Sequence, residues 1–344
     1  MLRVERARSL AACNTLALES RTRAFLRADS ADSIAAALDW ARSEGLAVLP
    51  LGGGSNIVLA GDVDALVLQV RTRGRELLRE EGDSIILRVQ AGESWHALVQ
   101  WCLRRGYHGL ENLALIPGTV GAAPIQNIGA YGVELERFVS AVHGVFLDDG
   151  RPFTFSASQC AFGYRDSVFK HSLRDACLLT AVDLHLHRSA RVELAYPTLQ
   201  HHLQQQGVRA PGPREVFDAV VAIRSARLPD PAREPNAGSF FKNPVVPREL
   251  AQRLASDHPD LPVYPAGPGQ AKLPAAWLIE RCGWKGRRRD GVGVHPAHAL
   301  VLVNYGDNSG AALLALAGEI QASVAGHFGI ALDIEPRIYG GGYD

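Results

Sequence analysis

The segment IPGTVGAAPIQNIGAYG, residues 116–132, combines four glycines and two prolines with no charged side chain. A helix does not tolerate this density of glycine and proline, and a solvated linker would carry more charge. The composition indicates a buried, convoluted loop whose free N–H groups can surround a phosphate or a ring. The amides of Gln126 and Asn127 could contact the edge of a heterocycle. A tight multi-turn connection inside a large domain is the alternative.

A second glycine-rich loop, GGGSN at residues 52–56, follows a predicted short buried strand over 47–51. Consecutive N–H groups at the end of a strand can converge on one anion, which favours a phosphate nest over a flexible turn. Ile57 stands where the third glycine of a G-x-G-x-x-G fingerprint belongs, and no G-x-x-x-x-G-K-[ST] motif occurs. A nucleotide site here would therefore be neither of the Rossmann type nor a P-loop.

The bulk composition indicates an ordinary soluble chain, with 344 residues, 47% hydrophobic and 21% charged residues. This length allows two or three domains with full cores. The formal net charge of zero argues against a nucleic-acid or membrane-surface partner. Five cysteines without a C-x-x-C pair argue against a disulfide framework and a thiolate metal cluster. We therefore expect no metal and a cytoplasmic location.

Hydrophobic spacing predicts a mixed succession of helices and strands along the chain. The segment 209–213, RAPGP, breaks this pattern and is a plausible linker. The predicted helices cover residues 33–44, 94–105, 199–206, 214–227, 272–282 and 309–327. The predicted strands cover residues 47–51, 63–70, 84–90, 139–147, 299–304 and 334–338.

Two further segments carry reactive side chains. In FGYRDSVFK, residues 162–170, Arg165 lies among aromatic residues, which suits a partly buried cation that meets an anion; an ion pair with Asp166 is the alternative. In PNAGSFFKNP, residues 235–244, we predict a turn that projects Ser239. No G-x-S-x-G surrounds this serine, so it is not a nucleophile elbow. It could donate a proton to a carbanion or simply stabilise a turn.

These segments occur in one order with two more, a helix followed by LVLVN (272–304) and the closing LDIEPRIYG (332–340). Together the set resembles the UDP-N-acetylenolpyruvoylglucosamine reductases, flavoenzymes also called UDP-N-acetylmuramate dehydrogenases. The resemblance spans nearly the whole chain. The stretch 193–202, with Tyr196, resembles the extra loop of the longer members of that family.

The resemblance implies an α+β fold, with a two-part FAD-binding domain of the vanillyl-alcohol-oxidase (PCMH) type and an α+β C-terminal substrate domain. Residues 1–70 would form the first FAD-binding subdomain, completed by the C-terminal strand at 331–344. Residues 71–212 would form the second subdomain, and residues 213–330 the substrate-binding domain.

The resemblance also implies the chemistry. NADPH would reduce FAD, and the flavin would pass hydride to the vinyl C3 of UDP-N-acetylglucosamine enolpyruvate, in peptidoglycan precursor synthesis. Negative charge would then develop at C2 and spread into the adjacent carboxylate. Arg165, aided by Glu335, would stabilise this charge, and Ser239 would protonate C2. Glu335 would have to be protonated, or bridged through Arg165, to avoid repelling the forming enolate.

The same resemblance assigns the remaining site residues. Pro235, Asp290 and His298 depart from its usual pattern, which affects fine substrate contacts and leaves the redox residues untouched. The substrate-binding residues would be Tyr196, Arg227, Asn243 and Lys285. The FAD-binding residues would be Gly52, Gly53, Gly54, Ser55, Asn56, Pro117, Gly118, Gly121, Ala122, Ile125, Gln126, Asn127, Gly129, Ala130, Tyr131 and Gly132.

Two other classes of function remain open from the residues alone. A serine hydrolase that uses Ser239 is disfavoured because the nucleophile elbow is absent. A catalytically silent flavin or sugar-nucleotide binding protein is disfavoured because Arg165, Ser239 and Glu335 are all present.

Overall fold

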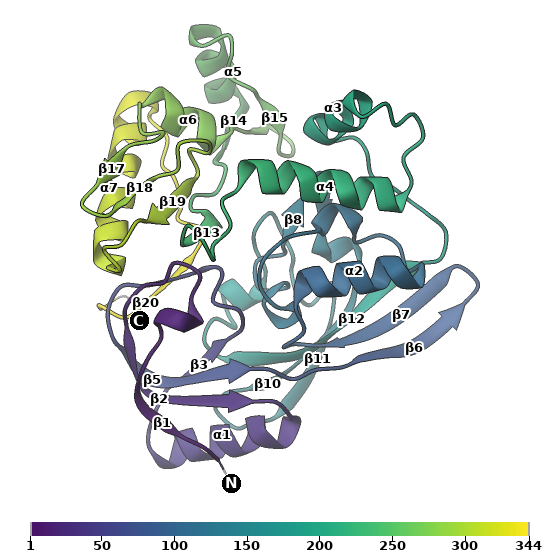
Figure 1. The fold of residues 1–344 in the computed structure, drawn as a ribbon, viewed down its shortest axis with the longest axis vertical. Helices are drawn as coiled ribbons and strands as arrows, with labels where there is room; N and C mark the ends of the chain where they lie inside the picture. The colour runs from purple at the N-terminus through teal and green to yellow at the C-terminus, as the bar shows by residue number, and fades with distance from the viewer. Residues whose placement is uncertain (1, 343–344) are drawn as a thin grey trace. The chain divides into compact units, whose positions relative to one another are not determined.

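A computed structural model describes residues 2–342 and divides them into two units, each built from separate stretches of chain (Figure 1). The first unit contains residues 2–8, 22–54 and 64–226, and the second contains residues 9–21, 55–63 and 227–342. The predicted three-part domain division stays a prediction. Met1, Tyr343 and Asp344, at its two ends, lie outside the described residues.

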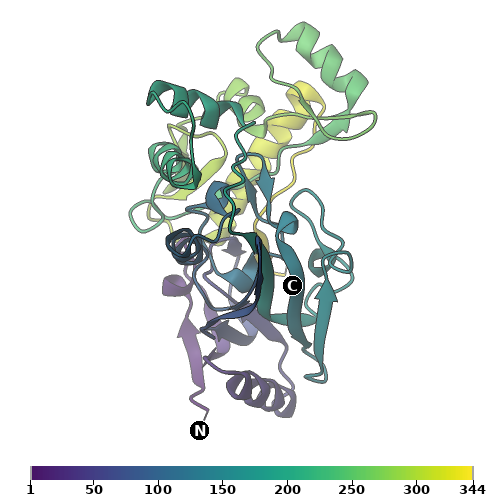
Figure 2. The same cartoon turned by 90° about the vertical axis from the view of Figure 1, so that its right-hand side faces the viewer.

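The first unit begins with a four-stranded sheet in the order β1-β2-β5-β3. Helix α1 (Ala31–Ser43) packs against this sheet, as Figure 2 shows from the side, and buries Ile34 and Leu38 in a cluster with Leu66 and Leu68. The Ser30 hydroxyl caps the helix by accepting a hydrogen bond from the Ser33 amide at 3.2 Å. The strands are β1 (Glu5–Ser9), β2 (Arg21–Ala28), β3 (Val48–Leu51) and β5 (Val63–Val70).

A five-stranded antiparallel sheet forms the larger part of the first unit, in the order β11-β10-β12-β7-β6. Helix α2 (Trp95–Arg105) lies over β7 and β12, and its Trp95 is fully buried in the same core as α4 (Pro213–Arg227) (Figure 1). Helix α3 (Pro197–Gln205) adds Leu199 to this core. The strands are β6 (Arg75–Glu81), β7 (Ser84–Gln90), β10 (Val139–Phe146), β11 (Pro152–Ser156) and β12 (Cys177–His187).

The second unit is built around the antiparallel sheet β13-β19-β18-β17. Its other elements are the small sheet β14-β16-β15, the helices α5 and α6, and the parallel pair β20 and β4. The strands are β4 (Ile57–Leu59), β13 (Asn236–Ser239), β14 (Val245–Pro247), β15 (Tyr264–Pro265), β16 (Gln270–Lys272), β17 (Arg288–Arg289), β18 (Val292–Val294), β19 (Val301–Asn304) and β20 (Arg337–Tyr339). The helices are α5 (Arg248–Asp257), α6 (Ala275–Arg281) and α7 (Gly310–Phe328).

Helix α7 is long and apolar enough to cross a membrane by length and composition, and it is the one such helix within residues 2–342. It packs against β18 and α6 and buries a stripe that includes Leu313, Ile320 and Val324. Its first residue, Gly310, lies so close to the Leu59 carbonyl that an added Cβ would be 1.9 Å from that oxygen. These contacts make α7 the core helix of the second unit.

Several local predictions are wrong, and in each case pairing with a distant segment decides the structure. The predicted turn at 236–239 is strand β13, because Asn236 and Ser239 pair with β19. The predicted helix at 272–282 begins only at Ala275, because residues up to Lys272 belong to β16. The predicted strand at 334–338 begins at Arg337, where the chain pairs with β4. The segment 209–213, which we predicted as a linker, joins α3 to α4.

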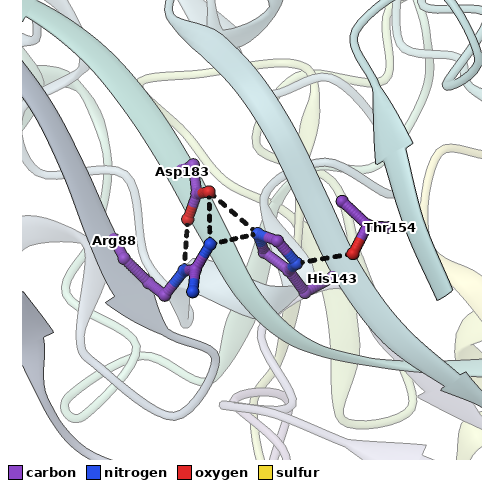
Figure 3. A network of polar contacts seen from close by, with 4 residues as sticks. All are labelled: Arg88, His143, Thr154 and Asp183. Atoms are coloured by element: carbon purple, nitrogen blue, oxygen red, sulfur yellow. Dashed lines mark hydrogen bonds and ion pairs between the residues drawn. The ribbon is translucent and has the colours of Figure 1, made fainter. Parts of the chain in front are cut away.

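A polar network crosses four strands of the five-stranded sheet (Figure 3). Arg88 of β7 donates two hydrogen bonds to the Asp183 carboxylate of β12, at 2.7 and 2.8 Å. The His143 ring on β10 lies 2.9 Å from Asp183 Oδ2 and 2.9 Å from Thr154 Oγ1. Burial alone would raise the pKa of Asp183, but the hydrogen bonds from Arg88 and His143 lower it from 3.8 to about 2.

Asp183→Asn should destabilise the folded protein by about 2 kcal/mol at pH 7, measured by urea unfolding, because the charge that Arg88 binds is lost. The folded pKa lies below the ordinary value, so this contribution is complete above about pH 4 and disappears as the pH falls toward 2. Asp218→Asn, in an exposed pair with Arg214, should leave the midpoint unchanged. A difference between Asp183→Asn and the parent that persists at pH 2 would contradict this account.

Candidate active site

The two predicted glycine loops meet within the first unit. A Cβ added to Gly52 would lie 2.5 Å from Thr119 Oγ1, and one added to Gly53 would lie 3.2 Å from the Gly118 Cα. Glycine is required here because any side chain would force the two loops apart. The structure thus brings together segments that are more than 60 residues apart in sequence.

The backbone of this glycine contact is available to a ligand. The N–H groups of Gly53 and Gly54 make no hydrogen bond to any described residue of the chain. Consecutive free N–H groups after a strand suit an anion such as the diphosphate of a dinucleotide. Ser55 and Asn56, at the end of the same loop, belong to the second unit, where the Asn56 carbonyl accepts a hydrogen bond from the Arg337 amide at 3.0 Å.

The first half of the 116–132 loop is tied down by backbone hydrogen bonds. The Trp95 amide donates to the Gly118 carbonyl at 3.1 Å, and the Val120 and Gly121 amides donate to Glu93 and Ala91 carbonyls at 2.9 Å. The short 3₁₀ helix η3 (Val120–Ala122) begins at this point. The loop is therefore a fixed part of the first unit.

The second half of the loop is fixed by Asn127, which is fully buried. Its Nδ2 donates to the Gly163 carbonyl at 3.0 Å, and its Oδ1 accepts from the Glu136 amide at 2.9 Å. The side chain that we predicted to contact the cofactor is thus engaged in joining the loop to the Arg165 segment. Ser167 reinforces this junction by donating its hydroxyl to the Ile125 carbonyl at 2.6 Å.

Arg165 lies at the tip of a two-residue turn whose flanking residues, Gly163 and Asp166, exchange backbone hydrogen bonds at 3.1 Å. Its Nη2 donates to the carbonyl of Gly129, in β8 (Gly129–Ala130), at 2.6 Å. The Asp166 carboxylate lies 2.8 Å from the His171 ring. One hydrogen bond therefore places the predicted catalytic guanidinium beside the predicted cofactor loop.

Strained backbone conformations occur in these segments, as they do elsewhere in the chain. Positive φ angles, which side-chain-bearing residues rarely adopt, occur at Leu115 (58°), Asn127 (42°), Tyr131 (49°) and Arg165 (54°). Such conformations persist only where the surrounding structure over-determines them, and they cluster at functional sites. Their presence in both the 116–132 loop and the Arg165 turn supports a functional role for this part of the first unit.

The other two predicted catalytic residues lie together in the second unit. Ser239 ends β13, and the carbonyl of the next residue, Phe240, accepts a hydrogen bond from the Glu335 amide at 2.9 Å. Phe240 and Phe241 are almost completely buried and anchor the segment. With the hydrogen bond from the Lys242 amide to the Asp333 carbonyl, also 2.9 Å, this contact holds the chain beside Ser239 against the chain that carries Glu335.

A buried asparagine shapes the approach to Ser239. The Asn236 side chain donates to the Glu234 and Pro229 carbonyls at 2.8 and 3.1 Å and accepts from the Gly238 amide at 2.8 Å. Gly238 then takes a φ of +70°, which produces the irregularity between β13 and β19 and turns the chain before Ser239.

The predicted substrate residues have different surroundings. Tyr196 is 41% exposed and packs edge-on against Tyr131 with ring centroids 5.3 Å apart. Arg227, the first residue of the second unit, is exposed. The Asn243 Oδ1 accepts from the Ala275 amide at 2.9 Å, and Lys285 pairs with Glu280 at 2.9 Å. Their role in substrate binding stays a prediction.

Sequence reasoning missed two polar residues in the first unit. Asn112 donates to the Tyr131 and Glu193 carbonyls at 3.0 and 2.9 Å, which joins the 116–132 loop to the stretch before Tyr196. Arg224 carries a buried Nε on α4. The signal for Arg224 was present, because an arginine four residues after Val220 falls on the apolar stripe of that helix.

Comparison with known proteins first defines the class. Residues 22–156 match the family model of the FAD binding domain, and residues 230–339 match that of the UDP-N-acetylenolpyruvoylglucosamine reductase C-terminal domain. The chain is thus an FAD-binding oxidoreductase with a distinct C-terminal domain, and the predicted FAD cofactor and α+β fold class are confirmed.

The relatives then define the family. The chain is 49% identical over 326 residues to the UDP-N-acetylenolpyruvoylglucosamine reductase of Chromobacterium violaceum, which covers 94% of this chain and 96% of the relative. It is 46% identical over 331 residues to the reductase of the same name from Pseudomonas putida, with 96% and 97% covered. The chain belongs to the UDP-N-acetylenolpyruvoylglucosamine reductase family, which confirms the resemblance seen in the motifs.

A solved structure supports the fold. The crystal structure of the UDP-N-acetylenolpyruvylglucosamine reductase from Thermus caldophilus matches 99% of this chain and 100% of its own, with a TM-score of 0.65 and 23% identity. This similarity concerns the fold and adds nothing on individual site residues.

Gly52→Ala should weaken FAD binding by at least about 10-fold, because its methyl group would clash with Thr119 Oγ1 and separate the two loops. The dissociation constant can be measured by titrating the apoprotein with FAD and following flavin fluorescence.

The double variant Gly52→Ala/Thr119→Ala removes that oxygen and should recover most of the affinity. Gly318→Ala, at an exposed helical site with open space around it, is the matched control and should leave FAD binding unchanged. Equal FAD affinity in Gly52→Ala and the parent would exclude the glycine contact from the cofactor site.

Proposed function

We propose that this protein reduces UDP-N-acetylglucosamine enolpyruvate to UDP-N-acetylmuramate with NADPH through bound FAD, in peptidoglycan precursor synthesis. The observation that carries the proposal is similarity of 46–49% over nearly the full length to reductases of that name. The FAD-binding match and the presence of Arg165, Ser239 and Glu335 in the expected motifs agree with it.

We assign the FAD diphosphate to the free N–H groups of Gly53 and Gly54 and to the facing Gly118 backbone. When bound, FAD supplies the hydride chemistry that amino-acid side chains lack. The remaining predicted cofactor residues of the 116–132 loop would line the same site. A flavin beside this loop would also lie near Arg165, because that side chain is bonded to Gly129.

Arg165 stabilises charge in the proposed mechanism. Hydride addition to C3 of the enolpyruvyl group leaves an electron pair at C2 that spreads into the carboxylate. A guanidinium placed at that carboxylate stabilises the transition state more than the ground state, because the negative charge grows during the step. The Gly129 hydrogen bond and the turn at residues 163–166 hold the guanidinium in place beforehand.

Ser239 donates the proton that C2 needs. A serine hydroxyl is a weak acid, so the reaction requires it to be held against the carbanion by its surroundings. The Asn236 hydrogen bonds and the buried Phe240 fix the backbone on both sides of Ser239. Glu335, on the adjoining chain, would support the protonation and act with Arg165 on the carboxylate.

The substrate is a small nucleotide sugar, and we propose neither a nucleic-acid nor a membrane partner. The formal net charge of zero and the absence of a disulfide framework in the sequence support a cytoplasmic location. Tyr196, Arg227, Asn243 and Lys285 are our candidates for contacts to the sugar nucleotide. A visible flavin spectrum that bleaches with NADPH and returns with the enolpyruvyl sugar would exclude a serine hydrolase.

Ser239→Ala should leave bleaching of the flavin by NADPH intact and slow reoxidation by the enolpyruvyl sugar by roughly 10²–10⁴-fold. Stopped-flow absorbance separates the two half-reactions. Ser256→Ala, an exposed serine on α5 whose hydroxyl bonds its own helix, is the matched control. Reoxidation at the parent rate in Ser239→Ala would remove this residue as the acid.

Arg165→Ala should slow the same oxidative half-reaction by at least about 10²-fold, because the developing charge loses its cation. Flavin content, read from the visible spectrum, must be reported alongside, since Arg165 also bonds the 116–132 loop through Gly129. An unchanged rate in flavin-loaded Arg165→Ala would take Arg165 out of the mechanism.

A further inference from the structure

Arg224 has no partner in the part of the chain that the structure describes. It lies on the apolar face of α4, beside the buried Val220 and Ile223, and makes neither a hydrogen bond nor an ion pair with residues 2–342. Its Nε is fully buried and unbonded. The residue as a whole is only partly buried, and its two terminal nitrogens, which bond nothing within residues 2–342, are open to a group from outside the chain.

The surroundings of Arg224 supply no negative charge. Burial lowers the pKa of Arg224; Tyr131 opposes this effect and the positive charge of Arg165 adds to it. Arginine stays protonated in proteins nonetheless. The ring of His96 also lies near Arg224, and its Nδ1 accepts a hydrogen bond from the Leu115 amide. Burial, and after it the charge of Arg224, lowers the pKa of this ring.

The geometry of the loop connects Arg224 to the proposed catalytic residue. Arg165 is bonded to the Gly129 carbonyl, and Tyr131 lies two residues further along the same loop. Arg165 is thus held at one short stretch of the 116–132 loop, and both its charge and Tyr131 act electrostatically on Arg224 within the same unit. Like charges repel, so an anion that binds between them would relieve the repulsion and the unmet hydrogen bonds of Arg224 together.

The proposed reaction creates a doubly charged group. The enolpyruvyl substrate enters with one carboxylate charge. Hydride, which carries two electrons, adds to C3 and the C2–C3 π pair moves to C2, so that the carboxylate and C2 together bear two negative charges until a proton reaches C2. One cation matches the ground state, and a second cation is needed only as the second charge develops.

We propose that Arg224 is a second guanidinium for the substrate carboxylate and acts with Arg165 on the dianion that hydride addition produces. This inference rests on the proposed function. Arg165 donates a hydrogen bond to the Gly129 carbonyl, whereas Arg224 donates none to residues 2–342. Arg224 can therefore turn toward a carboxylate without breaking a hydrogen bond to the protein. Its contribution should therefore depend on a carboxylate in the ligand and increase in the transition state.

Binding of two nucleotide sugars tests the inference without turnover. Calorimetric titration should show that Arg224→Met weakens the binding of UDP-N-acetylmuramate, which carries the carboxylate, by at least about 30-fold. Binding of UDP-N-acetylglucosamine, which lacks that group, should change less than about twofold. In stopped flow, reoxidation by the enolpyruvyl sugar should slow by at least about 10²-fold.

The matched control is Arg214→Met on the same helix, where the arginine is exposed and pairs with Asp218; both ligands should bind it as they bind the parent. Arg224→Lys, which keeps the charge but not the planar donor pair, should keep part of the preference for the carboxylate ligand. If Arg224→Met does not fold with FAD, Arg224→Lys alone tests the inference. The quantity compared is then the ratio of its affinities for UDP-N-acetylmuramate and UDP-N-acetylglucosamine.

Two outcomes would overturn the inference. Equal weakening of both nucleotide sugars would show that Arg224 does not recognise the carboxylate. A shift in the midpoint potential of bound FAD, with the preference for the carboxylate ligand intact, would assign Arg224 to the flavin instead. If Arg165→Ala also leaves that preference intact, the proposed function of Arg165 fails as well, whereas failure at Arg224 alone leaves it standing.

Discussion

The close approach of two backbones, at Gly52–Gly53 and Gly118–Thr119, is the constraint on which the first unit depends. It brings the end of strand β3 against the 116–132 loop, which leaves unbonded N–H groups at Gly53 and Gly54 for a ligand. The same loop, through the Gly129 carbonyl, holds the guanidinium of Arg165. The residues that we propose for the cofactor and the Arg165 guanidinium are thus positioned by one region of backbone in this unit.

The second unit also positions its proposed catalytic residues through backbone contacts. Ser239 and Glu335 are almost 100 residues apart, yet two backbone hydrogen bonds, at the Phe240 and Asp333 carbonyls, hold their segments together. Buried side chains on both sides, Phe240 and Asn236, keep that contact in register. Ser239 is thus positioned by the backbone on both sides of it, whereas the Arg165 guanidinium is held by its own hydrogen bond to the Gly129 carbonyl.

Two arginines of the first unit, Arg88 and Arg224, differ in whether an acidic side chain pairs with them. Arg88 meets Asp183 in a closed network with His143, and this pairing accounts for its burial within the sheet. Arg224 is also partly buried, on the face of α4 that carries Val220 and Ile223, and it meets no acid in the described chain. The contrast separates an arginine that stabilises the fold from one that we assign to a ligand, a distinction that residue type and helical spacing do not provide.

The sequence by itself determined the element types of most of the chain, the two glycine loops, the Arg165 and Ser239 segments and the family, because these depend on local composition and motif order. Only the tertiary structure decided that 236–239 is a strand, that the Asn127 side chain bonds Gly163 and Glu136, and that Arg224 is unpaired within residues 2–342. Each of these depends on partners distant in sequence, and local patterns carry no information on which distant groups will meet.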